Sequence, residues 1–501
     1  MTGHARAADT DVVVVGAGPV GLMLAGELRA GGARVTVLER LAAPTGESRA
    51  STLHARTMEI LDERGLLDAW GTVPRAAGGH FGGIALDFGG LDSRYAGQWK
   101  VPQTRTEHLL GERAVRLGAV VRRGHALVGL RQTGSGVEAE TEGPAGRSRI
   151  RAAYLVGCDG EDSTVRRLAG FAFPGTDATR ELLRADIAGI DVPDRRFERH
   201  EHGLAIAHRR PDGITRVMVH QFGRAAAPRA AAPGIAEVTS VWAKVTGEDI
   251  GAGTPVWVDA FGNARRQAER YRAGRVLLAG DAAHAQMPVG GQALNLGLQD
   301  AVNLGWKLAA QVRGRAPQGL LDSYHDERHA VGSRVLTNIE AQATLLLGGP
   351  EVEPLRAVVT DLLGHDEVVG HLAGMISGLD VRYPVGDDGP RGGHPLLGGR
   401  VPHWELATAS GASSTTELLR AGRGVLLDLA GCLPPGAGAG WADRVRTVTA
   451  APAPADGAPS RPGTAAVPAV LIRPDGHVVW CADGTAGPEA ALRRWFGDPH
   501  A

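Results

Sequence analysis

A glycine-rich segment near the N-terminus has the residue types and spacing that bind a phosphate-linked nucleotide. Gly16-Ala17-Gly18-Pro19-Val20-Gly21 is a G-x-G-x-x-G motif, and Glu39 follows 18 positions after its last glycine. Gly16 permits a tight turn, Gly18 lets backbone N–H groups approach a pyrophosphate, and Gly21 allows a helix to pack closely on a strand. An acid at position 39 accepts hydrogen bonds from ribose hydroxyls and repels a 2′-phosphate. The motif therefore predicts a site for FAD or NAD rather than for NADP.

The elements around this motif are those that must position it. Residues 12–15 form a short β-branched run that predicts a buried parallel strand, and helical apolar spacing follows up to Gly31. Residues 34–38 predict a second strand, which ends next to Glu39. A strand, a glycine-rich turn, a helix and a second strand in this order make the complete dinucleotide-binding unit, whose helix N-terminus offers N–H groups to phosphates.

Two later segments also run from a strand into a turn. Residues 155–160 predict a strand that leads into Asp159-Gly160, with Ser163 as a helix cap. Residues 275–281 predict a second buried strand, which leads into Gly280-Asp281. The segment 288–295 that follows is rich in small residues suited to lie flat against a ring system, and residues 294–312 have helical spacing.

The order of these three segments resembles the class A FAD-dependent monooxygenases, the para-hydroxybenzoate hydroxylase type of aromatic hydroxylase. The resemblance spans about residues 9–385 and extends through Arg49-Ala50 and through residues 103–107. Within this family, residues 57–65 and 301–308 are most similar to polyketide hydroxylases that tailor angucyclines and anthracyclines.

The resemblance implies which residues contact FAD. Arg49 is expected near the pyrophosphate, Gln103 near the flavin, and Asp281 on a ribityl hydroxyl. Leu127 is expected to meet adenine through its backbone, and the loop at 288–295 is expected to form one wall of the reaction chamber. The full set of expected cofactor contacts is Gly16, Gly18, Pro19, Gly21, Glu39, Arg40, Arg49, Ala50, Gln103, Leu127, Asp159, Asp281, Pro288, Gly290, Gly291, Leu294 and Asn295.

The middle of the chain loses the strand–helix–strand rhythm. Alternating runs such as residues 215–220 predict antiparallel strands. Aromatic residues are only 4% of the chain, so three of them in this segment are candidates to line an aromatic substrate cavity, although each could equally belong to the core. The candidate substrate contacts are Trp242, Trp257, Phe261, Met287 and Pro288.

The predicted fold is α/β: a Rossmann-like FAD-binding domain, an antiparallel-sheet substrate domain and a C-terminal domain that resembles thioredoxin. The FAD-binding domain is expected in two parts, residues 1–175 and 271–385, with the substrate domain at 176–270 and the C-terminal domain at 399–501. Residues 386–398 are predicted to be a linker and residues 449–468 a mobile loop. Strands at 424–429 and 469–480 are expected, the second with a hairpin turn at Asp475-Gly476. The chain has no C-x-x-C motif, which argues against a redox role for this domain.

Composition excludes several other classes. With 54 Lys and Arg against 55 Asp and Glu, the net charge of −1 argues against nucleic acid as the main partner. Three scattered cysteines do not predict a disulfide framework and fit a cytoplasmic protein. No apolar run is long enough for a transmembrane helix, so no membrane partner is expected. His202, His208 and His220 have no metal-ligand spacing, so no metal site is expected. The expected partner is a small polycyclic aromatic molecule, and a homodimer is left open.

The reaction implied by the resemblance is hydroxylation of a polycyclic aromatic polyketide. NADPH or NADH reduces the flavin, O₂ adds to give a C4a-hydroperoxide, and an electron-rich phenolic ring attacks the distal oxygen. An activated phenol needs no strong acid or base, so no catalytic residue is assigned. Baeyer–Villiger oxygen insertion beside a ketone and a non-enzymatic flavin-binding scaffold are the alternatives, whereas the lack of a W-x-W-x-I-P segment disfavours a halogenase. The exact substrate, the position hydroxylated and the choice between NADPH and NADH stay open.

Overall fold

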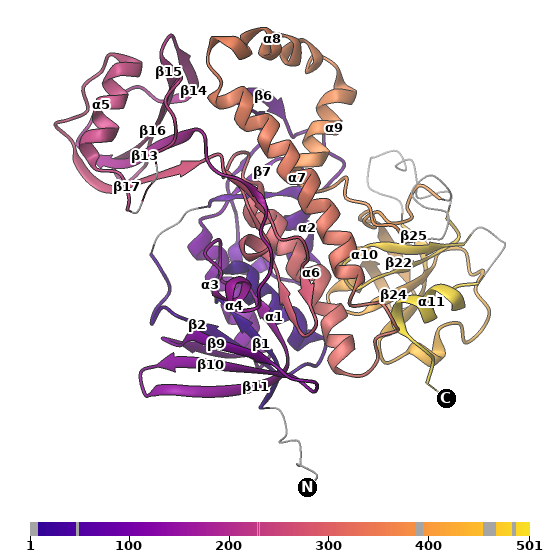
Figure 1. The fold of residues 1–501 in the computed structure, drawn as a ribbon. Helices are drawn as coiled ribbons and strands as arrows, with labels where there is room; N and C mark the ends of the chain where they lie inside the picture. The colour runs from indigo at the N-terminus through magenta and orange to yellow at the C-terminus, as the bar shows by residue number, and fades with distance from the viewer. Residues whose placement is uncertain are drawn as a thin grey trace.

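The protein is described by a computed structural model that covers residues 9–46, 50–227, 229, 231–385, 394–453, 467–482 and 487–500. Figure 1 shows a main body on the largest sheet, a smaller antiparallel sheet beside and above it, and a C-terminal part on the opposite side. None of the helices in these ranges combines the length and apolar character needed to cross a membrane. The predicted domain limits stay a prediction.

The main sheet has the order β19-β20-β11-β1-β2-β8, with β10 beside β11 and β9 beside β10. Strands β20, β11, β1, β2 and β8 run parallel, which confirms the parallel strands expected at the N-terminus. The strands are β1 (Thr10–Val15), β2 (Val35–Glu39), β8 (Val120–Arg123), β9 (Ala126–Gln132), β10 (Val137–Gly143), β11 (Gly146–Gly157), β19 (Arg272–Ala273) and β20 (Val276–Leu278).

Long helices pack on this sheet and on one another. The backbones of α1 and α6 approach closely, since a Cβ at Gly305 would lie 2.3 Å from Glu27 Cβ. Together these helices and the sheet bury the largest apolar core. The helices of the body are α1 (Pro19–Ala30), α2 (Ala55–Asp62), α3 (Gln103–Arg116), α4 (Thr164–Leu168), α6 (Gln292–Val312), α7 (Ser323–Leu347), α8 (Glu353–Leu362) and α9 (Asp366–Ser377).

Small sheets and short 3₁₀ helices complete the body. One sheet has the order β3-β7-β4, a second β12-β18-β21, and β5 and β6 form a pair. These elements are β3 (Thr52–His54), β4 (Arg75–Ala76), β5 (Gly78–Phe81), β6 (Ile84–Asp87), β7 (Gln98–Lys100), β12 (Gly175–Thr176), β18 (Arg265–Gln267), β21 (His284–Ala285), η1 (Leu67–Trp70), η2 (Gly280–Ala282) and η3 (Pro350–Val352).

The second large sheet is antiparallel, with the order β14-β15-β16-β13-β17, as predicted from the alternating runs. The helix α5 (Ile235–Thr246), which the sequence did not predict, covers the face turned away from the rest of the molecule (Figure 1). We call the opposite face the inner face. The strands are β13 (Glu181–Ala188), β14 (Arg195–His200), β15 (Gly203–Arg209), β16 (Ile214–Gln221) and β17 (Thr254–Gly262).

The C-terminal part contains a six-stranded mixed sheet, in the order β23-β22-β25-β24-β26-β27. The predicted hairpin turn is present, because Gly476 N donates a hydrogen bond to Arg473 O at 2.9 Å. The likeness to thioredoxin stays a prediction. The elements are β22 (Glu405–Thr408), β23 (Gly411–Ser414), α10 (Thr415–Leu419), β24 (Gly424–Asp428), η5 (Ala439–Trp441), β25 (Val445–Pro452), β26 (Ala469–Ile472), β27 (Val478–Cys481) and α11 (Glu489–Phe496).

One prediction for this part is wrong at its start. Residues 449–452, expected at the beginning of a loop, form the end of β25, because they pair with two strands at once: Thr449 with Asp428 of β24 and Pro452 with Leu406 of β22. Residues 454–466 of the same predicted loop, and residues 386–393 of the predicted linker, lie outside the described residues.

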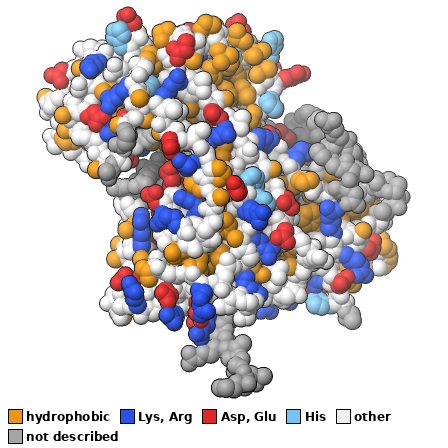
Figure 2. All heavy atoms as spheres, viewed as in Figure 1, with side chains coloured by type: hydrophobic (Ala, Val, Ile, Leu, Met, Phe, Trp, Pro, Cys, Tyr) orange, Lys and Arg blue, Asp and Glu red, His pale blue; other side chains and the backbone are white. Residues whose placement is uncertain are grey.

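The surface in Figure 2 mixes acidic and basic side chains without a large patch of either sign. Apolar side chains gather at the top of this view, where α8 exposes Leu355, Val358 and Leu362.

Candidate active site

The parallel strands β20, β11, β1 and β2 end together at one edge of the main sheet. Val15 is paired with both Gly157 and Leu38, and Gly157 is paired with Leu278. Open α/β sheets bind their ligands outside the carboxyl ends of such strands. The turns after these four strands bring together the predicted residues Gly16, Gly18, Pro19, Gly21, Glu39, Asp159 and Asp281.

The glycines of the first turn differ in their surroundings. A Cβ at Gly16 would lie 2.3 Å from Cys158 O, and a Cβ at Gly21 would lie 2.0 Å from Gly16 O. At Gly18, in contrast, a Cβ would meet no described atom within 4 Å. Helix α1 begins next to this glycine, and no side chain of the described residues caps it. Open space beside uncapped N–H groups at a helix N-terminus fits a pyrophosphate.

Glu39 is held by backbone groups on both sides. Its Oε2 accepts a hydrogen bond from Ala17 N, and its Oε1 accepts one from Leu41 N, each at 2.8 Å. His125 N donates to Glu39 O at 2.8 Å, which brings the start of β9, with the buried Leu127, beside this acid. Each carboxylate oxygen retains a second lone pair, so Glu39 keeps the capacity to accept from ribose hydroxyls.

The turns that carry Asp159 and Asp281 are tied to each other. Asp159 Oδ1 accepts a hydrogen bond from Ser163 Oγ at 2.5 Å, and Ser163 Oγ accepts one from Arg166 N at 3.0 Å, which confirms Ser163 as a helix cap. Arg166 Nη1 then donates to Ala282 O at 3.0 Å. Asp281 itself lies exposed in η2.

Three buried residues that the sequence did not predict hold the second of these turns. Asp300 of α6 accepts a hydrogen bond from Gly280 N at 3.1 Å, and its Oδ2 lies 2.8 Å from His284 Nε2. Its other oxygen accepts from Arg328 Nε at 2.7 Å. Burial raises the pKa of Asp300, but the charges of Arg328 and His284 lower it below its ordinary value. The sequence showed Asp300 only as an acid on the buried side of the predicted helix, and no local pattern indicated that His284 and Arg328 are its partners.

The loop before α6 is fastened to β3. Gly290 and Gly291 both have left-handed backbones, with φ of +67° and +69°. His54 Nε2 lies 2.8 Å from Gly290 O, and burial lowers the pKa of His54 to about 4, so its neutral imidazole donates this hydrogen bond. Asn295 Oδ1 accepts from His54 N at 2.9 Å, while its Nδ2 donates to Gly291 O at 2.7 Å. The predicted loop residues therefore form one connected unit with His54.

The start of α6 also reaches the nucleotide turn. A Cβ at Gly297 would lie 2.7 Å from Val20 Cγ2 and 3.1 Å from Gly280 Cα. Leu294, one turn earlier in α6, packs against the main core. The loop at 288–295 is thus placed next to both the G-x-G-x-x-G turn and η2.

The remaining cofactor candidates are less closely connected. Gln103, the first residue of α3, donates its backbone N–H to Ala50 O at 2.9 Å, so these two candidates are neighbours. Arg40 and Pro288 are exposed. Arg49 lies outside the described residues.

The aromatic substrate candidates lie on two sides of the antiparallel sheet. Trp242 belongs to α5 and is fully buried in the core between this helix and the sheet, the alternative that the sequence left open. Trp257 and Phe261 lie on β17 at positions that alternate with Val258 and Ala260, which pack towards α5. They therefore lie on the inner face. Met287 belongs to the apolar cluster against which Phe261 packs.

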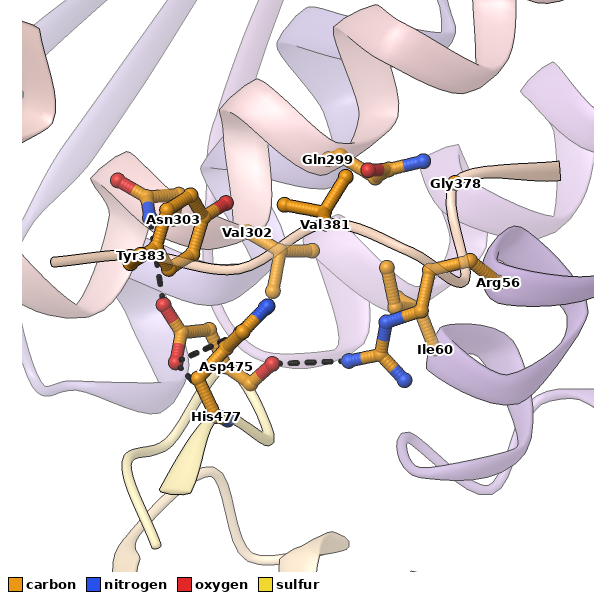
Figure 3. Close-up of a pocket in the computed structure, with 10 residues that line it drawn as sticks. All are labelled: Arg56, Ile60, Gln299, Val302, Asn303, Gly378, Val381, Tyr383, Asp475 and His477. Atoms are coloured by element: carbon orange, nitrogen blue, oxygen red, sulfur yellow. Dashed lines mark hydrogen bonds and ion pairs between the residues drawn. The ribbon is translucent and has the colours of Figure 1, made fainter. Parts of the chain in front are cut away.

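A separate cavity lies where the hairpin turn of the C-terminal part meets α2 and α6 (Figure 3). Arg56 donates to Asp475 O at 2.9 Å, and Asn303 Nδ2 lies 3.4 Å from Asp475 Oδ2. Gln299, Tyr383 and His477 complete its polar lining. None of the predicted cofactor or substrate residues lines this cavity, so we place the chemistry at the sheet edge instead.

Comparisons with known proteins show two family matches and several similar relatives. The "FAD binding domain" family matches residues 9–339, and the "Aromatic-ring hydroxylase, C-terminal" family matches residues 394–499. The chain is 46% identical to 12-dehydrotetracycline 5-monooxygenase/anhydrotetracycline 6-monooxygenase of Streptomyces rimosus subsp. rimosus, over 98% of this chain and 99% of the relative. A crystal structure of an aromatic hydroxylase from angucycline biosynthesis is 50% identical, with a TM-score of 0.93 over 98% of this chain and 100% of that one.

A third relative differs in its reaction. The chain is 41% identical to dialkyldecalin synthase of Streptomyces rugosporus, over 97% of this chain and 98% of the relative. The two family matches, the nucleotide turn and the near full-length similarity nevertheless agree, and the chain belongs to the FAD-dependent aromatic-ring hydroxylase family.

Proposed function

We propose that this protein uses NAD(P)H and O₂ to hydroxylate a polycyclic aromatic polyketide at its bound FAD. The observation that carries the proposal is the meeting of the G-x-G-x-x-G turn, the η2 turn and the loop at 288–295 at one sheet edge, next to apolar residues on the inner face of a second sheet. The similarity to a monooxygenase named for tetracyclines and to an aromatic hydroxylase from angucycline biosynthesis supports the substrate class.

FAD, when bound, supplies electron transfer from the nicotinamide donor and the activation of O₂. The chain's own residues bind and orient: Gly18 and the N-terminus of α1 receive the pyrophosphate, and Glu39 receives the ribose. Asp281, exposed in η2, receives a hydroxyl of the ribityl chain. The exposed Pro288 faces the ring system.

The second sheet supplies the other wall. Its inner face carries Leu182 and Ile206, which share one apolar cluster with Met287 and Val289 of the loop before α6. A flat aromatic ring system held between these walls is oriented and shielded from water, which limits wasteful release of H₂O₂. We assign no general base, because a phenolic ring supplies its own electrons.

The test is oxidation of NADPH and of NADH by the FAD-loaded protein, with a panel of phenolic tetracyclic and angular polyketides. We expect one or more compounds to stimulate oxidation and to yield a product heavier by one oxygen atom, with an unchanged carbon skeleton. A product with an enlarged ring would establish Baeyer–Villiger insertion instead.

The similarity to dialkyldecalin synthase favours a second candidate, a cyclisation that uses the same chamber without net oxidation. Conversion of a polyene panel without consumption of NAD(P)H, together with no stimulation by any phenolic compound, would support that candidate and overturn hydroxylation.

A further inference from the structure

Two polar side chains near the proposed chamber have buried nitrogen or oxygen atoms that find no hydrogen-bond partner among the described residues. Arg184 of β13 is only 8% exposed, and its Nε and Nη2 make no hydrogen bond within the described parts of the chain. Gln286, directly after β21, has both amide atoms buried and equally unpaired in those parts. Buried donors and acceptors are almost always satisfied in proteins, because leaving them unpaired destabilises the fold. Side chains of this kind therefore point to a ligand.

The guanidinium of Arg184 is held in place by an aromatic ring. Its Cζ lies 4.5 Å from the centroid of the Trp257 ring, a cation–π distance. Burial is the main cause that lowers the pKa of Arg184 to about 10, and the positive charge of Arg216 adds to it. The group still carries its charge at neutral pH, so an anion is the ligand that it lacks.

The two acids near Arg184 already have other partners. Asp186 accepts hydrogen bonds from Arg216 Nε and Nη2, each at 2.7 Å, and from Arg210 Nη1 at 3.2 Å. Asp259, the register partner of Arg184 on β17, accepts from Ala260 N at 2.9 Å. Both carboxylates raise the pKa of Arg184 through their charge, but neither accepts a hydrogen bond from its Nε or Nη2 in the described structure.

The strand pattern places Arg184 on the same face as the chamber. Leu183 and Ala185 pack towards α5, whereas Leu182 belongs to the cluster that contains Met287. Side chains alternate along a strand, so Arg184 shares the inner face with Leu182, about 7 Å further along β13. A polycyclic ring system that begins at Met287 and extends along this face would reach Arg184 at its far end.

We propose that Arg184, stacked on Trp257, binds an anionic oxygen at the end of the substrate remote from the flavin, while Gln286 hydrogen-bonds an oxygen nearer to it. The anion is a carboxylate, an enolate or an ionised phenol. This inference rests on the proposed function, because it assumes that a polycyclic ring system enters the chamber.

The test compares two probes that differ only at one end. A dihydroxyanthraquinone with a carboxylate and the same ring system with a methyl group in its place are titrated into the FAD-loaded protein, and each dissociation constant is measured from the change in absorbance. We expect the wild type to prefer the carboxylate roughly ten- to a hundred-fold, the range for a hydrogen bond to a charged group. Arg184→Met should reduce this preference to about one, and Arg184→Lys should retain part of it.

Matched controls separate this effect from misfolding. Arg209→Met removes an exposed arginine at the end of β15 and should leave the preference unchanged. The affinity of Arg184→Met for the methyl probe reports whether its chamber is intact. An equal preference in wild type and Arg184→Met, with the methyl probe still bound, would overturn the assignment of Arg184 alone. Failure of the wild type to bind either probe would overturn this inference together with the proposed substrate class.

Discussion

Arg473, in the turn between β26 and β27, provides a sharp test of how the C-terminal part is held to the FAD-binding body. Its side chain is fully buried, and its Nη1 and Nη2 donate to Glu327 of α7 at 2.7 and 2.9 Å. Its Cζ also lies 4.6 Å from the ring centroid of Trp495 and 5.3 Å from that of Trp306. We expect Arg473→Met to destabilise both parts of the protein, because it leaves Glu327 buried with less compensating charge.

The magnitude follows from the chemistry of the pair. Burial raises the pKa of Glu327, but the charges of Arg473 and Lys307 outweigh burial and lower this pKa to about 2. The carboxylate is therefore ionised in the folded protein. Removing one partner of a buried ion pair costs about 3–5 kcal/mol. Since 1 kcal/mol shifts Tm by roughly 2–4 °C in a domain of 150–250 residues, the expected fall is about 6–20 °C.

The assay follows thermal unfolding by two signals, tryptophan fluorescence and the increase in flavin fluorescence as FAD is released. Both midpoints should fall together in Arg473→Met. The control is Arg494→Met, which removes an exposed arginine of α11 whose Cζ lies 5.7 Å from the same Trp495 ring, and which should shift Tm little. A fall in Arg473→Met no larger than in this control, or an unchanged temperature of FAD release, would refute the reasoning.

Three further predictions concern the sheet edge. Glu39→Ala should weaken FAD binding about ten- to a hundred-fold in an equilibrium titration, because a charged hydrogen-bond acceptor is lost; an unchanged Kd would contradict the ribose assignment. His54, with a folded pKa of about 4 against an ordinary 6.5, binds fewer protons when folded. The contribution of His54 to stability is therefore fully present above pH 6.5, and it declines by about 3 kcal/mol as the pH falls towards 4. The free energy of unfolding of His54→Asn should depend less on pH over this range than that of the wild type. Gly291→Val should raise the ratio of H₂O₂ to product, because a Cβ at this position would lie 3.1 Å from Thr52 Cβ. The control is Gly319→Val, which tests backbone strain alone, because Gly319 has a φ of +81° and a Cβ there would meet no described atom within 4 Å.

Local patterns predicted the parts of the fold whose determinants are local. The strand at 12–15, the glycine turn and the helix after it depend on residues within a single unit, and the structure places them as expected. The helix at 235–246 was missed, so Trp242 was considered for the substrate cavity although it packs in a core. The strand end at 449–452 was missed because its Ala/Pro-rich composition is typical of loops, and only pairing with β22 and β24 makes it a strand.

The same distinction between local and distant determinants applies to the residues of the candidate site. Glu39 and Asp281 were proposed because each follows a recognisable strand, and the structure places both at the same sheet edge. His54 was not, because its hydrogen bond to Gly290 joins residues that are 236 positions apart. Arg184 was not, because a lone arginine in an alternating strand gives no signal until the structure shows that its guanidinium is buried and unpaired among the described residues.

A chain of buried contacts links the C-terminal part to the candidate site, although this part holds none of the cofactor candidates. The η2 turn is held by Asp300, Asp300 by Arg328, and Arg328 Nη1 donates to Tyr383 Oη at 3.0 Å. The Tyr383 ring in turn lies 4.4 Å from the His477 ring and 5.1 Å from Arg473 Cζ. Buried polar networks of this kind have few alternative arrangements, because each group that loses its partner is costly. The hairpin at 473–477 thus stabilises the position of η2, and with it Asp281, through packing and charge.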